Sequence, residues 1–319
     1  MNRSFKDYLL ITARGLGMGA ADVIPGVSGG TIAFITGIYE ELINSIKSFN
    51  AVFVNKLFKQ GIAPAWKHVN GNFLVAVLTG ILTSIFSLAR LFSWLLDNYQ
   101  LMVWAFFFGL IVGSAIHVGR QITKWNILSI SMLLMGTAIA YFITVAAPAT
   151  TPQTHWFIFV SGAIAISAMI LPGISGSFIL LLLGKYEFML NVIRDLQVSF
   201  LAVFAAGCVV GLLVFSNIIS WLFRHFRNAT LALLTGFMIG SLNKLWPWKE
   251  VIETRVDSHG QVVPFLERSI SPYRFEDLYN LQPQLGPVIL FALTGLAIIL
   301  IFEFKARTPK EAEVIKEKI

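Results

Sequence analysis

The chain has 319 residues, of which 56% are hydrophobic and 13% are charged, and its mean hydropathy is +0.74. This composition excludes an ordinary soluble domain and indicates an integral membrane protein. The 24 Lys+Arg against 17 Asp+Glu give a net charge of +7, which we attribute to loops on one side of a membrane rather than to a nucleic-acid-binding surface.

The N-terminal segment begins with basic residues, as a signal peptide does. Arg14 interrupts its apolar core after only a few residues, which is too short for the hydrophobic region of a cleaved signal. We therefore expect the segment to be retained. The single cysteine, Cys208, lies within an apolar run, so an internal disulfide is excluded and a packing role is expected.

The first predicted element, about 8–47, contains the stretch ADVIPGVSGG at residues 21–30. Pro25-Gly26 breaks any helix there. We expect a re-entrant hairpin, in which two short helices meet at the break within the membrane and return to the same side. Irregular backbone at that depth requires surrounding protein or a water-filled cavity.

Six apolar stretches then approach the roughly 20 residues that cross a bilayer as a helix. They are continuous and do not alternate with polar residues, which favours helices over a barrel. The predicted spans are 72–96, 101–118, 126–147, 198–223, 229–245 and 286–302.

An internal repeat relates the two halves of the chain. The sequence VIPGVSGGTIAFITGIYEELINSIK recurs as ILPGISGSFILLLLGKYEFMLNVIR, so Pro25-Gly26 matches Pro172-Gly173 at a shift of 172 − 25 = 147, and a second re-entrant hairpin is expected at about 156–193. Further on, FLVAVLTG matches FLAVFAAG at a shift of 200 − 73 = 127. The difference, 147 − 127 = 20, predicts an insertion in the first half, the basic segment 51–70.

The predicted fold is an all-α polytopic membrane protein of two halves, 1–150 and 151–319. Each half has one re-entrant hairpin and three transmembrane helices, and because three crossings are an odd number the halves must be inverted repeats. Many secondary transporters share this architecture. The loops support it, because basic loops alternate with base-poor ones, which places both termini in the cytoplasm and the loop 246–284 outside.

Each hairpin break is followed by a helix start, at Ser28 or Ser175. The first turn of a helix leaves about four N–H groups without partners and carries about half a positive charge, so it is a candidate anion site, and phosphate is a natural occupant. A polar break that only packs is the alternative. The candidate phosphate cradle comprises Ser28, Gly29, Gly30, Thr31, Ser175, Gly176 and Ser177, with Arg90 and Lys185 as candidate cations.

Three carboxylates are candidates for coupling transport to a proton or a sodium ion. Asp22 lies three residues before Pro25, and its repeat partner is Met169. Glu40 and Glu187 hold matching places in GIYE and GKYE, where an interfacial role is the alternative. The histidines are scattered without metal-ligand spacing, so no metal and no cofactor are predicted.

With these residues in view, GAADVIPGVSGGTIAFITGIYEELI and ILPGISGSFILLLLGKYE resemble the signatures of the bacterial polyprenyl-phosphate (undecaprenyl-phosphate) transporter family, formerly a domain of unknown function. The resemblance spans nearly the whole chain. It implies a flippase in the bacterial cytoplasmic membrane that moves undecaprenyl phosphate from the outer to the inner leaflet. The lipid carrier is then reused in peptidoglycan and surface-glycan synthesis.

Two other functions stay open at this point. A secondary transporter of a small inorganic or organic anion would use the same hairpin breaks. An intramembrane lipid phosphatase-type enzyme is disfavoured, because no histidine lies beside Ser28 or Ser175 in the sequence. The second half departs from the first at Met169, Ser177 and Phe178, so the two breaks need not be equivalent. The sequence does not decide whether the protein forms a homo-oligomer.

Overall fold

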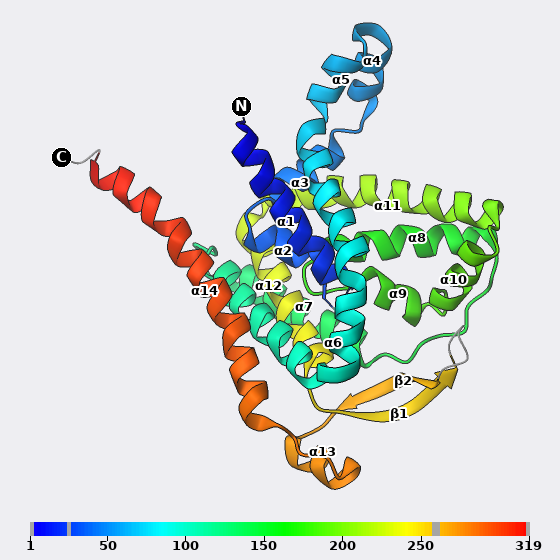
Figure 1. The fold of residues 1–319 in the computed structure, drawn as a ribbon. Coiled ribbons are helices and arrows are strands. Elements are labelled where there is room, and N and C mark those ends of the chain that lie inside the picture. The colour runs from blue at the N-terminus through cyan, green and yellow to red at the C-terminus, as the bar shows by residue number, and fades with distance from the viewer. Residues whose placement is uncertain (1–2, 24–26, 257–261, 317–319) are drawn as a thin grey trace.

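The computed structural model describes residues 3–23, 27–256 and 262–316. The predicted break at Pro25-Gly26 therefore lies outside the described residues. As predicted, the chain is mostly helical (Figure 1). The first half contains α1 (Phe5–Val23), α2 (Gly29–Ile35), α3 (Tyr39–Lys47), α4 (Ala51–Gln60), α5 (Ile62–His68), α6 (Gly71–Gly119) and α7 (Ile127–Val145). The second contains α8 (His155–Ile170), α9 (Gly176–Leu182), α10 (Tyr186–Arg194), α11 (Val198–His225), α12 (Arg227–Leu245), β1 (Lys249–Val256), β2 (Val262–Ser269), α13 (Pro272–Tyr279) and α14 (Leu285–Lys316).

The two hairpin regions have the same internal order of helices. In each, a long helix packs against a seven-residue helix, α1 on α2 and α8 on α9, and a nine-residue helix follows, α3 or α10. The returning arm is thus two helices rather than the predicted one, and α9 and α10 are bent by 105° to each other. The shared order agrees with the repeat, while the inversion of the two halves stays a prediction.

Glycine explains why each returning arm is broken. Gly37 and Gly184 adopt φ of +73° and +61°, a left-handed conformation that costs glycine little. The amide of Ile38 bonds to the carbonyl of Ala33 at 3.0 Å, and that of Lys185 to the carbonyl of Leu180 at 2.8 Å. These bonds close Schellman-type helix ends, which satisfy the last carbonyls of α2 and α9.

The predicted spans 72–96 and 101–118 are two helices that share the label α6 and meet at a kink rather than at a longer loop. The residue at this kink with non-helical backbone angles is Tyr99, with φ −136° and ψ 38°. In the second half, α11 and α12 are separated at Phe226, which has φ −136° and ψ 48°. Phe226 is 226 − 99 = 127 residues after Tyr99, so the same kink recurs at the repeat shift.

Four stretches of the described chain, 71–88, 90–119, 127–145 and 198–225, are long and apolar enough to cross a membrane, or five if the bent pair α9–α10 is counted. The sequence predicted six spans. The described apolar portion of α14, Leu285–Ile301, is shorter. The predicted span 229–245 is α12, which carries polar residues such as Thr230, Thr235 and Ser241 and is buried by its neighbours α6, α7 and α11. Because α12 is surrounded mainly by protein rather than lipid, it can carry more polar residues than the lipid-facing helix α11.

The insertion 51–70 and the long loop 246–284 lie at two opposite ends of the molecule (Figure 1). The insertion 51–70 forms the projecting pair α4 and α5, at the end where α1 begins and toward which α14 runs (Figure 1). The predicted loop 246–284 contains the antiparallel hairpin β1–β2 and α13 at the other end. Trp246 and Trp248 anchor this hairpin, because their indole N–H groups donate to the carbonyls of Ile270 and Pro283.

Candidate functional site

The first tip, which we define as Asp22 and residues 27–31, is a capped helix start. Ser28 precedes α2 with an extended backbone, and its Oγ accepts a hydrogen bond from the Gly30 amide at 3.1 Å. The Asp22 Oδ1 accepts from the Gly29 amide at 2.7 Å, and the Thr31 amide donates to the Ser28 carbonyl at 2.9 Å. The first-turn donors that the sequence offers to a phosphate are therefore satisfied by the protein, with a carboxylate in the anion's place.

The second tip, residues 169–177, is in direct contact with the first. The Ser28 hydroxyl donates to the Met169 carbonyl at 2.7 Å, and the Gly173 amide donates to the Thr31 hydroxyl at 3.0 Å. Ser28 and Thr31 are completely buried. A side chain at Gly30 would collide with the Ile170 carbonyl, so the absence of a Cβ allows the two backbones to meet. The start of α2 and the second tip thus form one joint, which we call the tip contact.

The start of α9 in the second tip is less protected. Ser175 makes no capping bond, and its hydroxyl pairs with that of Ser177 at 2.9 Å. Ser177 is exposed, and the position that matches Asp22 is Met169, so no carboxylate occupies the matching place. Gly176 packs against α8, because a Cβ there would lie 2.6 Å from the Ala165 carbonyl. The two tips are consequently unequal, as the departures in the second sequence motif suggested.

Lys244, at the end of α12, is a cation near the second tip that sequence reasoning missed. Its Nζ lies 5.0 Å from the centre of the Phe178 ring and 3.0 Å from Glu267 Oε2 on β2. The neighbouring Lys249 donates to the Asn243 carbonyl at 2.9 Å. Burial lowers the pKa of Lys249 to about 8, with a further contribution from the positive charge of Lys244. The sequence signal that could have revealed Lys244 is its position in the last turn of α12, which has no charged residue between Arg227 and Lys244.

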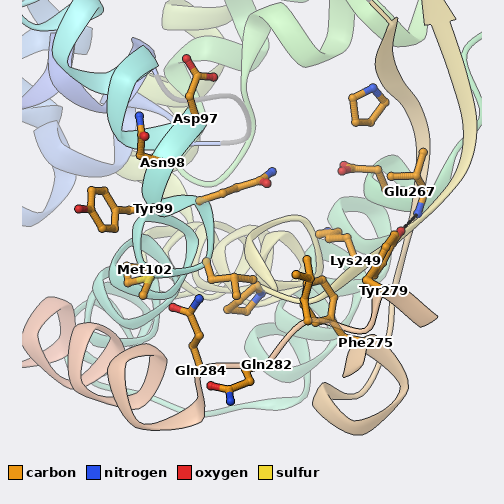
Figure 2. Close-up of a pocket in the computed structure, with 16 residues that line it drawn as sticks. Asp97, Asn98, Tyr99, Met102, Lys249, Glu267, Phe275, Tyr279, Gln282 and Gln284 are labelled. Carbon is orange, nitrogen blue, oxygen red and sulfur yellow. Dashed lines mark hydrogen bonds between the residues drawn. The ribbon is translucent and has the colours of Figure 1, made fainter. Parts of the chain in front are cut away.

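Two cavities adjoin the kink of α6. One, of about 410 Å³, lies between residues 97–102 and the β1–β2 hairpin, with Lys249 and Glu267 on one wall (Figure 2). The other, of about 490 Å³, has an apolar lining. That lining consists of Phe92, Leu95, Tyr99, Met102, Val103, Phe106, Phe107 and Phe291. Tyr99 and Met102 line both cavities, so a polar space and an apolar space lie side by side at the kink.

The two predicted cations outside the tips have different surroundings. Lys185 is 1% exposed; its Nζ donates to the Thr151 carbonyl at 2.7 Å and lies over the Phe157 and Phe188 rings. It therefore ties the segment before α8 to the second hairpin. Arg90 lies on α6 and is exposed.

The remaining coupling candidates lie in matching first turns. Glu40 is the second residue of α3, and Glu187 is the second residue of α10. Glu40 forms an ion pair with Arg227 at 2.8 Å, and Glu187 is partly buried. Asp22, by contrast, bonds directly to the backbone of the first tip, which makes it the candidate that is best placed to respond to an occupant there.

Apolar helices of membrane-crossing length define an integral membrane protein. Within its described residues, the first and second tips meet through polar contacts. The chain belongs to the undecaprenyl phosphate translocase-like family, whose match covers residues 18–263. The resemblance seen in the two sequence motifs is thereby confirmed.

Two relatives support this assignment. The chain is 48% identical to the polyprenyl-phosphate transporter of Vibrio cholerae over 294 residues, which cover 92% of this chain and 96% of that protein. It is 34% identical to the polyprenyl-phosphate transporter of Staphylococcus aureus over 252 residues, which cover 73% and 84%. No solved structure matches the chain significantly. The family is one of transporters, not enzymes, which sets aside the phosphatase-type alternative.

Proposed function

We propose that the chain moves a polyprenyl phosphate, specifically undecaprenyl phosphate, from the outer to the inner leaflet of the bacterial cytoplasmic membrane. The lipid carrier is then reused in peptidoglycan and surface-glycan synthesis. The observation that carries the proposal is the tip contact, where hydroxyl and amide groups of Ser28, Thr31 and Gly173 are buried inside an apolar helical bundle. Polar groups at membrane depth are costly and commonly serve function. The two relatives are named for transport of this lipid class.

The phosphate binds at the tips in two steps. It first meets the start of α9, where Ser175, Gly176 and Ser177 offer donors without a competing carboxylate and Lys244 is a nearby cation. The start of α2 becomes available when Asp22 releases the Gly29 amide, since a carboxylate and a phosphate compete for the same donors. The conformation described above is the closed state of this cradle. Arg90 remains a candidate for a later contact, while Lys185 has a positioning role.

The apolar cavity beside the α6 kink favours a lipid over a small anion. Its walls are apolar or aromatic, which suits an isoprenoid chain, because burial of apolar surface is favourable at about 25 cal/mol per Å². A small inorganic or organic anion would gain nothing from these walls. The cavity borders the polar space that contains Lys249 and Glu267, so a head group and a tail fit side by side.

Coupling to a cation would make inward movement favourable. A negative head group that moves inward opposes the membrane potential, at about 2.3 kcal/mol per charge per 100 mV. Asp22 is the candidate carrier of a proton or a sodium ion, because neutralising its carboxylate weakens the bond that closes α2. Glu40 is less suited, since Arg227 already neutralises it.

The orientation we propose places both termini and the pair α4–α5 in the cytoplasm, and β1, β2 and α13 outside. Support comes from the basic insertion 51–70, which lies at the end opposite to the β1–β2 hairpin (Figure 1). We expect neither a cofactor nor a nucleic-acid partner.

A vesicle assay distinguishes lipid transport from small-anion transport. The purified protein is reconstituted with polyprenyl phosphate in both leaflets, and a phosphatase that cannot cross the membrane is added outside. We expect hydrolysis to reach the inner-leaflet lipid only when the protein is present, without uptake of radiolabelled inorganic phosphate. Phosphate uptake with a protected inner leaflet would instead support the small-anion transporter.

A further inference from the structure

A second polar pocket, separate from the tip contact, lies where α3, α11 and α12 meet. Its volume is about 330 Å³. The polar groups that matter in its lining are Glu40, Asn44, Lys47, Ser220, Arg224 and Arg227. Three cations and one carboxylate give the pocket a net charge of 3 − 1 = +2.

Two of the cations converge on one neutral hydroxyl. Lys47 Nζ lies 3.2 Å and an Arg224 guanidinium nitrogen 3.3 Å from Ser220 Oγ, and the Ser220 hydroxyl donates to Asn44 Oδ1 at 3.0 Å. Among the residues that the structure describes, neither cation forms an ion pair. Like charges held this close repel each other, so an anion placed between the two cations would stabilise the arrangement.

The shape of the pocket and its neighbours indicate which anion. A shallow cavity that shares Lys47 and Arg224 with the pocket continues over Ile218 and Trp221, which are exposed on α11. An exposed tryptophan beside basic residues is typical of the boundary between membrane and water. An anion with an apolar chain would place its head between the cations and its chain along this exposed face.

We propose that this pocket holds the phosphate monoester head group of the transported lipid on the cytoplasmic side, after it has left the tips. Arg224 presents a planar fork that suits phosphate, and Lys47 supplies a mobile charge. The pocket is linked to the first tip by packed rings, because Phe34 of α2 contacts Tyr39, and Tyr39 contacts the pocket residue Phe223. This inference rests on the proposed function and adds a release site to it.

The test uses the full-length protein in phosphatidylcholine nanodiscs, with farnesyl phosphate as the probe and inorganic phosphate and farnesol as comparisons. We expect Lys47→Gln and Arg224→Gln each to weaken farnesyl phosphate binding by about tenfold, the effect of losing one charge-assisted hydrogen bond. Arg224→Lys should retain most of the affinity. The matched control is Arg194→Gln, since Arg194 holds the repeat position of Lys47 but pairs with Asp195 at the surface.

The outcomes separate this inference from the proposed function. Wild-type affinity in both Gln variants, with normal lipid transport by the wild type, would overturn the release site and leave the proposed function standing. Equal competition by inorganic phosphate would overturn the lipid assignment of the pocket. Weakened binding in the Gln variants, with Arg194→Gln unchanged and thermal unfolding of all variants alike, supports it. Failure of the wild type to move lipid at all would count against the proposed function itself.

Discussion

The Gly173 amide donates a hydrogen bond of 3.0 Å to the Thr31 hydroxyl, which lies 142 positions earlier in the chain. This bond joins the start of α2 to the second tip in a buried environment. Because an unpaired amide in such a place is costly, the bond holds the two hairpins in one arrangement. We expect a movement of the tips during transport to break this bond and to satisfy both groups in another way.

The first prediction concerns this bond. Thr31→Val keeps the shape of the side chain but leaves the Gly173 amide unpaired, which we expect to lower the free energy of unfolding by about 1–3 kcal/mol. Thermal unfolding in detergent measures the change. Thr36→Val is the control, because the Thr36 hydroxyl bonds only within its own helix segment. Equal stability of the two variants would show that the bond contributes nothing.

The second prediction concerns the closest approach of the two tips. Gly30→Ala places a methyl group against the Ile170 carbonyl, and the overpacking should cost about 1–3 kcal/mol. We expect the tips to separate and lipid transport to fall strongly, while the protein still inserts. Gly286→Ala is the control, since a Cβ there has open space. Normal transport by Gly30→Ala would contradict the tip contact as the functional joint.

The third prediction concerns Asp22. Asp22→Asn keeps an oxygen that accepts from the Gly29 amide but removes the titratable charge. We expect lipid binding to be retained and the response of transport to an imposed proton or sodium gradient to be lost in reconstituted vesicles. Glu253→Gln, at an exposed site on β1, should respond like the wild type. A gradient response in Asp22→Asn equal to that of the wild type would make Asp22 structural only.

The fourth prediction concerns the pH dependence of stability at Lys249. Its pKa in the folded protein is about 8, against 10.5 for a free lysine. Between these values the unfolded chain binds more protons than the folded one, so stability should rise as the pH increases from about 8 to about 10.5. Lys249→Met should flatten this rise, by up to about 3 kcal/mol and less if water reaches the site. A difference between variant and wild type that stays constant over this range would refute the claim.

The fifth prediction concerns orientation. In a Cys208→Ala background, Tyr273→Cys on α13 and Phe58→Cys on α4 introduce cysteines at strongly exposed positions. An impermeant thiol reagent should label the cysteine at position 273 in intact cells and the one at position 58 only after permeabilisation. The reverse pattern would invert the proposed orientation.

Local patterns made much of the fold predictable. The break at Pro172-Gly173 is a short-range signal with a direct backbone meaning, and the repeat shift of 127 residues relates the kinks at Tyr99 and Phe226. The breaks at Gly37 and Gly184 were not predicted. The β1–β2 hairpin was not predicted, because hydropathy assigns the segment 246–284 to a loop between two spans and does not distinguish strands within it. Nor was α12 recognised as a helix buried by protein, since hydropathy does not report the neighbours of a span.

The candidate site was only partly predictable. Sequence position placed Ser28 and Ser175 at helix starts, as observed. It did not reveal that Asp22 already occupies the donors of α2, nor that Lys244 lies beside Phe178, because both depend on how distant segments pack. The tip contact is likewise a tertiary feature, joining residues 141 and 142 positions apart.

The most direct test of the central claim is head-group access in vesicles that contain polyprenyl phosphate in both leaflets and an impermeant phosphatase outside. We expect the wild-type protein to expose the inner-leaflet lipid to hydrolysis. Gly176→Val, whose side chain collides with the Ala165 carbonyl, should insert but leave that lipid protected. An inner leaflet that stays protected with the wild-type protein, or is hydrolysed equally with Gly176→Val, would contradict the central claim.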